Sequence, residues 1–134
     1  MISLIDVYTV TEASGILFDL LKERTPEQSI SHKSMPSMEE HINFVRSVPY
    51  RAWFLIKNEA NEYVGSCYLT DQYEIGVFVF KKYQQQGYGK EAVEAIMCMY
   101  RGPFLANVNP KNKASAKLFE GLGFTHIQNT FGHD

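Results

Sequence analysis

Short apolar runs and amphipathic segments alternate through the first third of the chain. Residues 2–8 (ISLIDVY) are apolar and β-branched, which predicts a strand. Thr11 is expected to cap a helix whose apolar positions follow a helical period and which ends near Arg24. Two prolines and four serines in residues 25–38 predict an irregular loop, and Ser37 is expected to cap a short second helix.

The middle of the chain is strongly strand-like. Residues 51–57 and 63–69 flank a short polar connector, which predicts a hairpin, and residues 74–80 predict the next strand. The pattern then changes to a helical period over residues 89–100. These segments therefore predict an antiparallel unit that leads into a helix.

The last third predicts two further strands around a helix. Residues 104–108 are expected to form a short strand and residues 126–131 a final one. Between them, residues 111–124 predict a helix with Asn112 as its N-cap and Gly123 just past its end. The element order β-α-α-β-β-β-α-β-α-β predicts a mixed α/β fold, in which a mostly antiparallel central sheet is flanked by helices.

Length and composition are those of an ordinary globular protein. The chain has 134 residues, 45% of them hydrophobic and 21% charged, which suits one domain over residues 1–134. A formal net charge of −2 argues against nucleic acid as a partner. The N-terminus lacks a basic region followed by a long apolar run, and no stretch reaches the roughly 20 apolar residues of a membrane helix. We therefore expect a cytoplasmic protein without a membrane partner.

The cysteines and histidines add no further chemistry. Cys67 and Cys98 both lie within apolar patterns, which indicates free thiols in a reducing compartment rather than a disulfide. The four histidines show no spacing typical of a metal site, so no metal is expected; they are His32, His41, His126 and His133.

A glycine-bearing turn, QQQGYGK, joins the strand at 74–80 to the next helix. The first N–H groups of a helix lack helical partners and carry partial positive charge, which suits an anion. Gly87 and Gly89 let the backbone approach such an anion closely, and Lys90 adds a cation. Glycine spacing alone leaves two interpretations open, a plain turn and a diphosphate site. The Walker pattern is absent, and the context does not suit a Rossmann dinucleotide site.

Two segments resemble one family. Gln84-x-x-Gly87-x-Gly89, after a strand and before an amphipathic helix, resembles the [Q/R]-x-x-G-x-[G/A] signature of the GNAT acyltransferase superfamily. Residues 108–124 (VNPKNKASAKLFEGLGF) are similar to the later signature of that family, at the expected separation. The resemblance covers residues from about 51 to 131, and it implies a GNAT-like fold with splayed fourth and fifth strands.

The resemblance implies acetyl-CoA as a co-substrate. The pyrophosphate would lie on the backbone of the turn, and the pantetheine arm would pair with the backbone of the preceding strand, with Gly76 permitting a bulge. Asn112 matches a family asparagine near the CoA arm, a role compatible with its capping role, and Phe119 would pack near the thioester. The turn and strand residues implied to bind the cofactor are Val77, Phe78, Val79, Gln84, Gln85, Gln86, Gly87, Tyr88, Gly89 and Lys90.

The implied reaction is direct attack of an amine on the thioester. Glu74 is the candidate base, because several family members place a catalytic glutamate on this strand; a solvated strand-end carboxylate is the alternative. The N–H of Val79 is the candidate oxyanion donor. Phe119 stands where many members carry a tyrosine acid, so Ser115, one turn earlier, is the candidate replacement. Asn107 stands where peptide-acetylating members often carry a base, which disfavours a protein N-terminus as acceptor.

The acceptor is expected to be a primary amine of a small molecule, with an amino sugar as one option. Residues 25–50 would shape its pocket, His32 and His41 are expected on the surface, and Trp53 is expected to pack in its strand. Two alternatives remain at this point, a protein or peptide N-acetyltransferase and a catalytically weak acyl-CoA-binding module. A homodimer is also left open.

Overall fold

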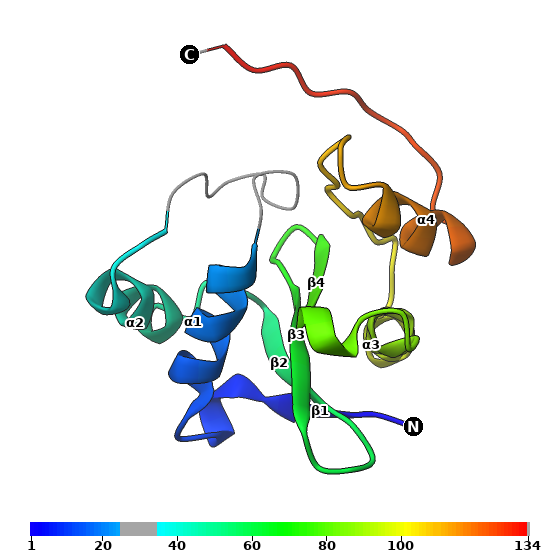
Figure 1. Cartoon of the computed structure of the whole chain (residues 1–134). Coiled ribbons are helices and arrows are strands. Elements are labelled where there is room, and N and C mark those ends of the chain that lie inside the picture. The colour runs from blue at the N-terminus through cyan, green and yellow to red at the C-terminus, as the bar shows by residue number, and fades with distance from the viewer. Residues whose placement is uncertain (25–34, 134) are drawn as a thin grey trace.

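Four strands form a single antiparallel sheet in the computed structural model, which describes residues 1–24 and 35–133. The strands are β1 (Ser3–Asp6), β2 (Ala52–Lys57), β3 (Tyr63–Leu69) and β4 (Ile75–Val79), in the order β1-β2-β3-β4 (Figure 1). Strands β2, β3 and β4 are rich in apolar, β-branched or aromatic residues, as is typical of pleated strands with buried faces. The expected hairpin of residues 51–57 and 63–69 is confirmed, and β4 pairs antiparallel with β3 as the next strand.

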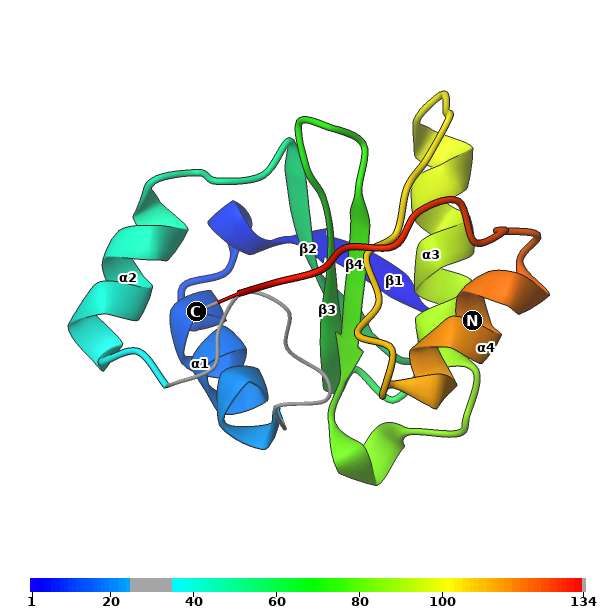
Figure 2. The same cartoon turned by 90° about the horizontal axis from the view of Figure 1, so that it is seen from above.

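Helices cover both faces of the sheet (Figure 2). One face carries α1 (Ala13–Glu23) and α2 (Met38–Arg46), and the other carries α3 (Tyr88–Met99) and α4 (Lys113–Gly121). Two short 3-10 turns, η1 (Val7–Thr9) and η2 (Lys81–Tyr83), connect strands to helices. Within the described residues, no helix is long and apolar enough to cross a membrane.

Strand alternation divides the interior into two cores. On β2, Trp53 and Leu55 face α1 and α2, whereas Ile56 packs toward α3. The α3 side is filled by Val93 and Ile96, which are fully buried. The two cores hold the sheet between its helical layers.

The expected strand at residues 104–108 is reduced to a single parallel bridge. Ile75 N–H donates to Leu105 C=O at 2.8 Å, and Leu105 N–H donates to Tyr73 C=O at 2.9 Å. Past this bridge the chain makes no further ladder with β4. The edge of β4 beyond Ile75 is consequently open, which is the splay that the family resemblance implied.

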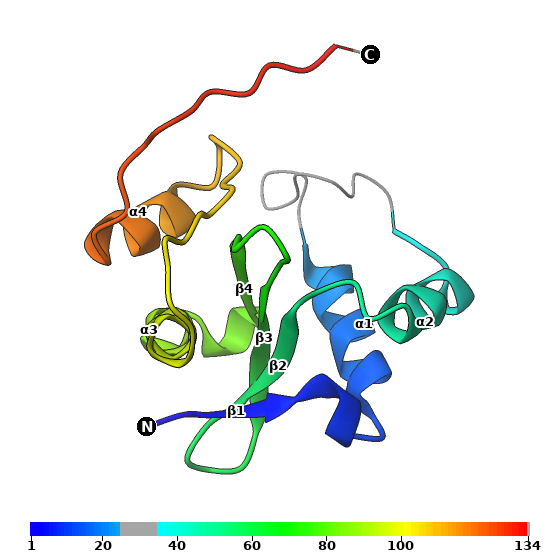
Figure 3. The same ribbon diagram turned by 180° about the vertical axis from the view of Figure 1, so that it is seen from behind.

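The expected last strand is wrong. Residues 126–131 are extended but unpaired, and they run outside the sheet after α4 (Figures 1 and 3). Ile127 is 72% exposed and Phe131 is 91% exposed, so neither side chain packs against a core. A segment forms a strand only where a neighbouring strand accepts its hydrogen bonds, and the described residues provide none here.

Local helix signals were partly correct. Ser37 caps α2 in a full capping box with Glu40, and Gly123 follows α4 with a φ of +91°. The expected cap at Thr11 is wrong, because the N-cap of α1 is Glu12 and no side-chain bond is made there. The first turn is instead secured by backbone, with Ala13 N–H donating to Val10 C=O at 3.2 Å.

The expected bulge at Gly76 is also wrong. The register between β3 and β4 runs through the Tyr68↔Gly76 pair without a shift. Gly76 instead makes room for an aromatic ring, because a Cβ there would lie 2.1 Å from Cζ of Tyr68. The missing side chain is therefore a packing requirement of the face that carries α1 and α2.

Candidate active site

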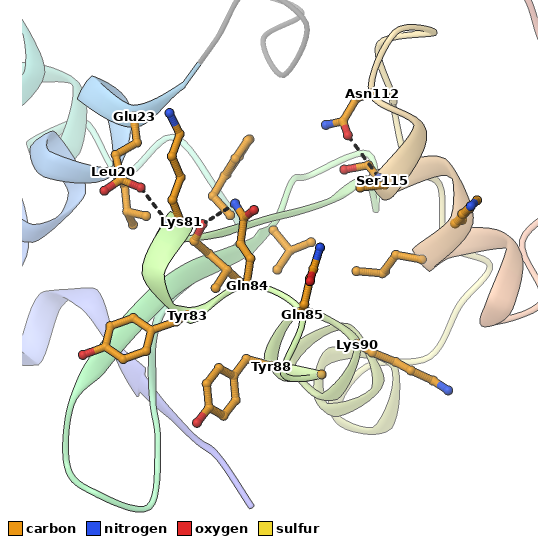
Figure 4. A pocket seen from close by; sticks show the side chains of 18 of the residues that line it. Leu20, Glu23, Lys81, Tyr83, Gln84, Gln85, Tyr88, Lys90, Asn112 and Ser115 are labelled. Carbon is orange, nitrogen blue, oxygen red and sulfur yellow. Dashed lines mark hydrogen bonds between the residues drawn. The ribbon is translucent and has the colours of Figure 1, made fainter.

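A cleft of about 530 Å³ opens along the free edge of β4, between the glycine turn and the start of α4 (Figure 4). We call it the β4 cleft. Most of the residues that the sequence nominated for cofactor binding line it, together with the candidate acid. These residues are Val77, Phe78, Val79, Gln84, Gln85, Gly87, Tyr88, Gly89, Lys90, Asn112 and Ser115.

The glycine turn exposes the first N–H groups of α3 to this cleft. Gly87 is the N-cap of α3 with a φ of +84°, a conformation that glycine adopts without strain. The first backbone bond of the helix runs from Glu91 N–H to Gly87 C=O at 3.1 Å, so the N–H groups of the three intervening residues have no helical acceptor. The turn also ties back to the strand, since Gln84 Nε2 donates to Val79 C=O at 3.1 Å (Figure 4).

The backbone of β4 presents donors to the cleft in alternation. Phe80 N–H donates inward to Val64 C=O at 2.9 Å, whereas Ile75 N–H donates outward to Leu105. Successive residues of a strand point their N–H groups to opposite sides. The N–H groups of Val77 and Val79 therefore share the side of Ile75 and point to the open edge.

Helix α4 forms the opposite wall. Asn112 accepts a bond from Ser115 N–H at 3.1 Å and caps the helix, which fixes the position of its first turn (Figure 4). The absence of a side chain at Gly89 lets α3 and α4 approach closely, because a Cβ there would lie 3.1 Å from Cδ1 of Leu118. Asn112 therefore fixes the start of α4, and Gly89 allows the close packing of α4 against α3.

Cations outnumber carboxylates around the β4 cleft. Among the described residues, its lining includes Lys81, Lys90, Lys117 and Arg24, against the single carboxylate of Glu23. That carboxylate is already engaged, because it accepts the N–H of Lys81 at 2.8 Å. The combination of helix N–H groups and lysines is suited to an anionic ligand such as a diphosphate.

A second cavity of about 380 Å³ adjoins the first on the side of α1 and α2. We call it the aromatic cavity; its aromatic lining consists of His41, Phe44, Tyr50, Trp53, Tyr68 and Phe78. Three residues, Leu20, Arg24 and Phe78, line both cavities. The sequence pointed to residues 25–50 for this pocket, and it missed the contributions of Arg24 and Tyr68.

Ring stacking makes the floor of the aromatic cavity rigid. Tyr50 and Tyr68 stack with centroids 4.0 Å apart and planes 4° apart, and Trp53 meets Tyr50 edge-on at 4.8 Å. Trp53 is buried in β2 as expected, and its Nε1 donates to Ser66 Oγ at 3.0 Å. Burial raises the pKa of Tyr50 and that of Tyr68, so both hydroxyls stay neutral at ordinary pH.

The expected surface position of His41 is wrong. His41 is 3% exposed and lies on the face of α2 that also carries Val45, four residues on. Its Nε2 lies 3.0 Å from Ser14 C=O, and its ring packs against Phe18 with centroids 5.4 Å apart. Burial lowers the pKa of His41, with the bond to Ser14 opposing the shift. His32 lies outside the described residues.

Glu74 lies apart from both cavities. Its Oε1 accepts from Thr70 Oγ1 at 3.1 Å, and its Oε2 accepts from Nδ2 of Asn107. Glu74 precedes Phe78 by four strand residues, a separation of roughly 13 Å along β4. A base role for Glu74 thus requires water between the carboxylate and the amine.

Two other nominated residues also lie off the cleft. Phe119 is 6% exposed and packs edge-on against Phe124 at 5.1 Å within the α3-side core. Gln86 is exposed and does not line the cleft. No group of three or more His, Cys, Asp or Glu side chains in the described ranges is placed to hold a metal ion.

Comparison with known proteins identifies the family of the chain. Residues 12–125 match the family described as acetyltransferase (GNAT) domain. The chain therefore belongs to the GNAT acetyltransferase family, and the enzyme class expected from the sequence is confirmed. No curated protein matches the chain.

Several solved structures share the fold. A domain from Methanocaldococcus jannaschii superposes with a TM-score of 0.82 at 20% identity, covering 97% of this chain and 92% of that one. A putative acetyltransferase from Salmonella typhimurium, solved with acetyl-CoA, gives 0.68 at 18% identity over 93% and 79%. A spermidine N-acetyltransferase from Vibrio cholerae, solved with CoA and spermine, gives 0.74 at 13% identity over 95% and 82%.

Proposed function

We propose that the protein transfers an acetyl group from acetyl-CoA to a primary amine of a small molecule. The observation that carries this proposal is the junction of two cavities at Phe78. The β4 cleft has features suited to a CoA arm, and the aromatic cavity reaches the same side chain from the other face of the strand. A thioester in one cavity and an amine in the other would meet there.

Acetyl-CoA would complete the edge of β4. Its pantetheine amides would pair with the outward backbone groups of Val77 and Val79, as an added strand does. Its diphosphate would accept from the free N–H groups of α3, with Lys90 and Lys81 supplying charge. The structure of the Salmonella relative contains acetyl-CoA, which supports this choice of cofactor.

The reaction would be a direct aminolysis of the thioester. The neutral amine forms the new C–N bond, the oxyanion accepts from Val79 N–H, and collapse breaks the C–S bond. The proton of the amine leaves through water toward Glu74, and Ser115 or water protonates the departing thiolate. Ser115 belongs to α4 and lines the β4 cleft, which supports this role.

The dimensions of the aromatic cavity support a small acceptor. A volume of about 380 Å³ lies near the lower end of the range for small-molecule pockets. Aromatic walls would hold the acceptor body, and the polar groups are few. Amino sugars, amino acids and polyamines are the classes of primary amine that a first screen must compare.

The test follows free thiol while the protein is mixed with acetyl-CoA and such a panel. Turnover of at least one class is expected, and silence across all of them would overturn the proposal. Lys90→Ala should raise the KM for acetyl-CoA several-fold and leave that for acetyl-pantetheine, which lacks the diphosphate, unchanged. Lys22→Ala is the matched control, because Lys22 pairs with Asp19 and lines neither cavity.

Glu74→Gln tests the route of the proton. It should lower kcat by about 100-fold or more without changing the affinity for acetyl-CoA, because general-base contributions are typically about 10²–10⁴-fold. The loss should shrink as pH rises and more of the free amine is already neutral. An unchanged kcat across the pH range would remove Glu74 from the mechanism and leave the transfer reaction itself intact.

A further inference from the structure

The guanidinium of Arg24 lies at the junction of the two cavities. Arg24 follows the last turn of α1, and its Cζ lies 3.6 Å from the centroid of the Phe78 ring. Arg24 and Phe78 both line the β4 cleft and the aromatic cavity. Whatever occupies the junction will therefore contact this cation.

The charge of Arg24 has no partner among the described residues. Its Nε is buried and makes no hydrogen bond, and no carboxylate in the described ranges forms an ion pair with it. Burial lowers the pKa of Arg24, with the hydroxyls of Tyr68 and Tyr50 opposing the shift, yet a guanidinium stays protonated at ordinary pH. A desolvated cation is costly without an anion, and the face of Phe78 offsets only part of that cost.

We propose that Arg24 binds the carboxylate of the acceptor, and that the acceptor is an α-amino acid with an aromatic or large aliphatic side chain. The proposal rests on the acetyl transfer proposed above and names the acceptor class for that same site. A carboxylate is the anion that a planar guanidinium binds most specifically, through two parallel hydrogen bonds.

The position of Arg24 selects an amine next to the anion. A carboxylate on Arg24 would lie against Phe78, one residue from the Val79 N–H that faces the cleft edge. In an α-amino acid a single carbon separates the amine from the carboxylate. Binding the anion at the junction would therefore leave the amine beside the thioester carbonyl.

The rest of the aromatic cavity suits an apolar side chain. Beyond Arg24, its walls include the Tyr50–Tyr68 stack, Trp53 and Leu17. Among the described residues, its lining contains one carboxylate, that of Glu40, which is exposed and already accepts Ser37 N–H at 2.9 Å. A polyamine would need several anionic partners, so this lining disfavours a polycation.

The experiment compares α-amino acids with their own amides. Phenylalanine, tryptophan, leucine and methionine are each assayed beside the corresponding amide and the decarboxylated amine, at saturating acetyl-CoA. For at least one side chain, kcat/KM should be tenfold or more higher for the acid, mainly through KM. Amides keep the shape and the amine and lose only the negative charge, so the comparison isolates the anion.

Arg24→Gln should abolish the preference for the acid over its amide. Arg24→Lys should retain part of it, since a lysine keeps the charge but lacks the two parallel N–H donors of the guanidinium. Arg46→Gln is the control, because Arg46 is an exposed arginine outside both cavities. Calorimetry with acetyl-CoA and the thermal midpoint verify that each variant is folded. Arg24 is half-buried and forms no ion pair in the described ranges, so its removal should not lower that midpoint.

Two results would overturn the inference while leaving the proposed function in place. One is equal turnover of acids, amides and decarboxylated amines by the natural protein. The other is turnover of amino sugars or polyamines that does not change in Arg24→Gln. Absence of turnover with every amine, together with intact acetyl-CoA binding, would instead overturn the proposed function and this inference with it.

Discussion

At the scale of single residues, the candidate site depends on glycines, because a side chain at two of these positions would collide with a neighbour. The absent side chain of Gly89 lets α3 and α4 meet, and that of Gly76 leaves room for the Tyr68 ring. Gly87 has a different role, because its φ of +84° is a backbone requirement and open space surrounds it. Gly76 and Gly89 thus leave space for a neighbouring side chain, whereas Gly87 allows a positive φ.

Gly76→Ala should damage the aromatic cavity and spare the β4 cleft. The new Cβ would lie 2.1 Å from Cζ of Tyr68, so the ring must leave its stack with Tyr50. Overpacking of this kind costs about 1–3 kcal/mol of unfolding free energy. We expect a raised acceptor KM and unchanged acetyl-CoA affinity, measured by kinetics and calorimetry. Gly15→Ala, where nothing lies within 4 Å, is the matched control and should not lower stability.

His41 should make stability depend on pH. Burial lowers the pKa of His41 in the folded protein. In the unfolded chain the pKa of a histidine is about 6.5. The unfolded state therefore binds more protons between these two values, and stability falls as pH drops below about 6.5. In urea unfolding between pH 8 and pH 5, His41→Gln should show a shallower decline than the natural protein. Equal slopes would mean that His41 titrates alike in both states.

At the scale of elements, two of the three expected helix caps are confirmed. Ser37 and Asn112 cap α2 and α4 as the sequence indicates, because a cap depends on residues three positions apart. The expected strand at 126–131 failed for the opposite reason. Strand propensity is a local property, but a strand also needs a neighbouring strand, and the local sequence contains no information about that neighbour.

Asn112 should contribute to stability and to binding in separable ways. Asn112→Ala removes the bond to Ser115 N–H and should cost about 1 kcal/mol of unfolding free energy. Because α4 walls the β4 cleft, acetyl-CoA affinity should fall as well. Asn112→Ser restores a capping hydroxyl and should recover the stability. If affinity returns together with stability, the amide of Asn112 acts through the helix alone and does not touch the cofactor.

At the scale of the whole molecule, the site lies where two helical layers meet at one sheet edge. The glycine turn was readable from the sequence because its residues are contiguous. Arg24, Tyr68 and His41 were not, since they come together only when α1, α2 and β3 pack. The general position of the acceptor pocket could be predicted, and the charge at its junction could not.

The segment that leads into α4 is hydrogen-bonded to only one end of β4. In the described residues, the segment between α3 and α4 pairs with the sheet only through Leu105, at the start of β4. Val77 and Val79 present unpaired N–H groups beyond that point, whereas Phe78 and Phe80 belong to the β3 ladder. A ligand that pairs with the free N–H groups of β4 would lie between β4 and α4 and would contact both.

Amide hydrogen exchange should therefore alternate along β4. In the free protein, the N–H groups of Phe78 and Phe80 should exchange slowly and those of Val77 and Val79 faster. Acetyl-CoA should slow Val77 and Val79 selectively, because only these donors face the cleft. It should also raise the unfolding free energy, by about 2.7 kcal/mol at a hundredfold excess over its Kd. Uniform slowing of all four amides would indicate general stabilisation without an added strand, and a pantetheine arm paired to β4 would be ruled out.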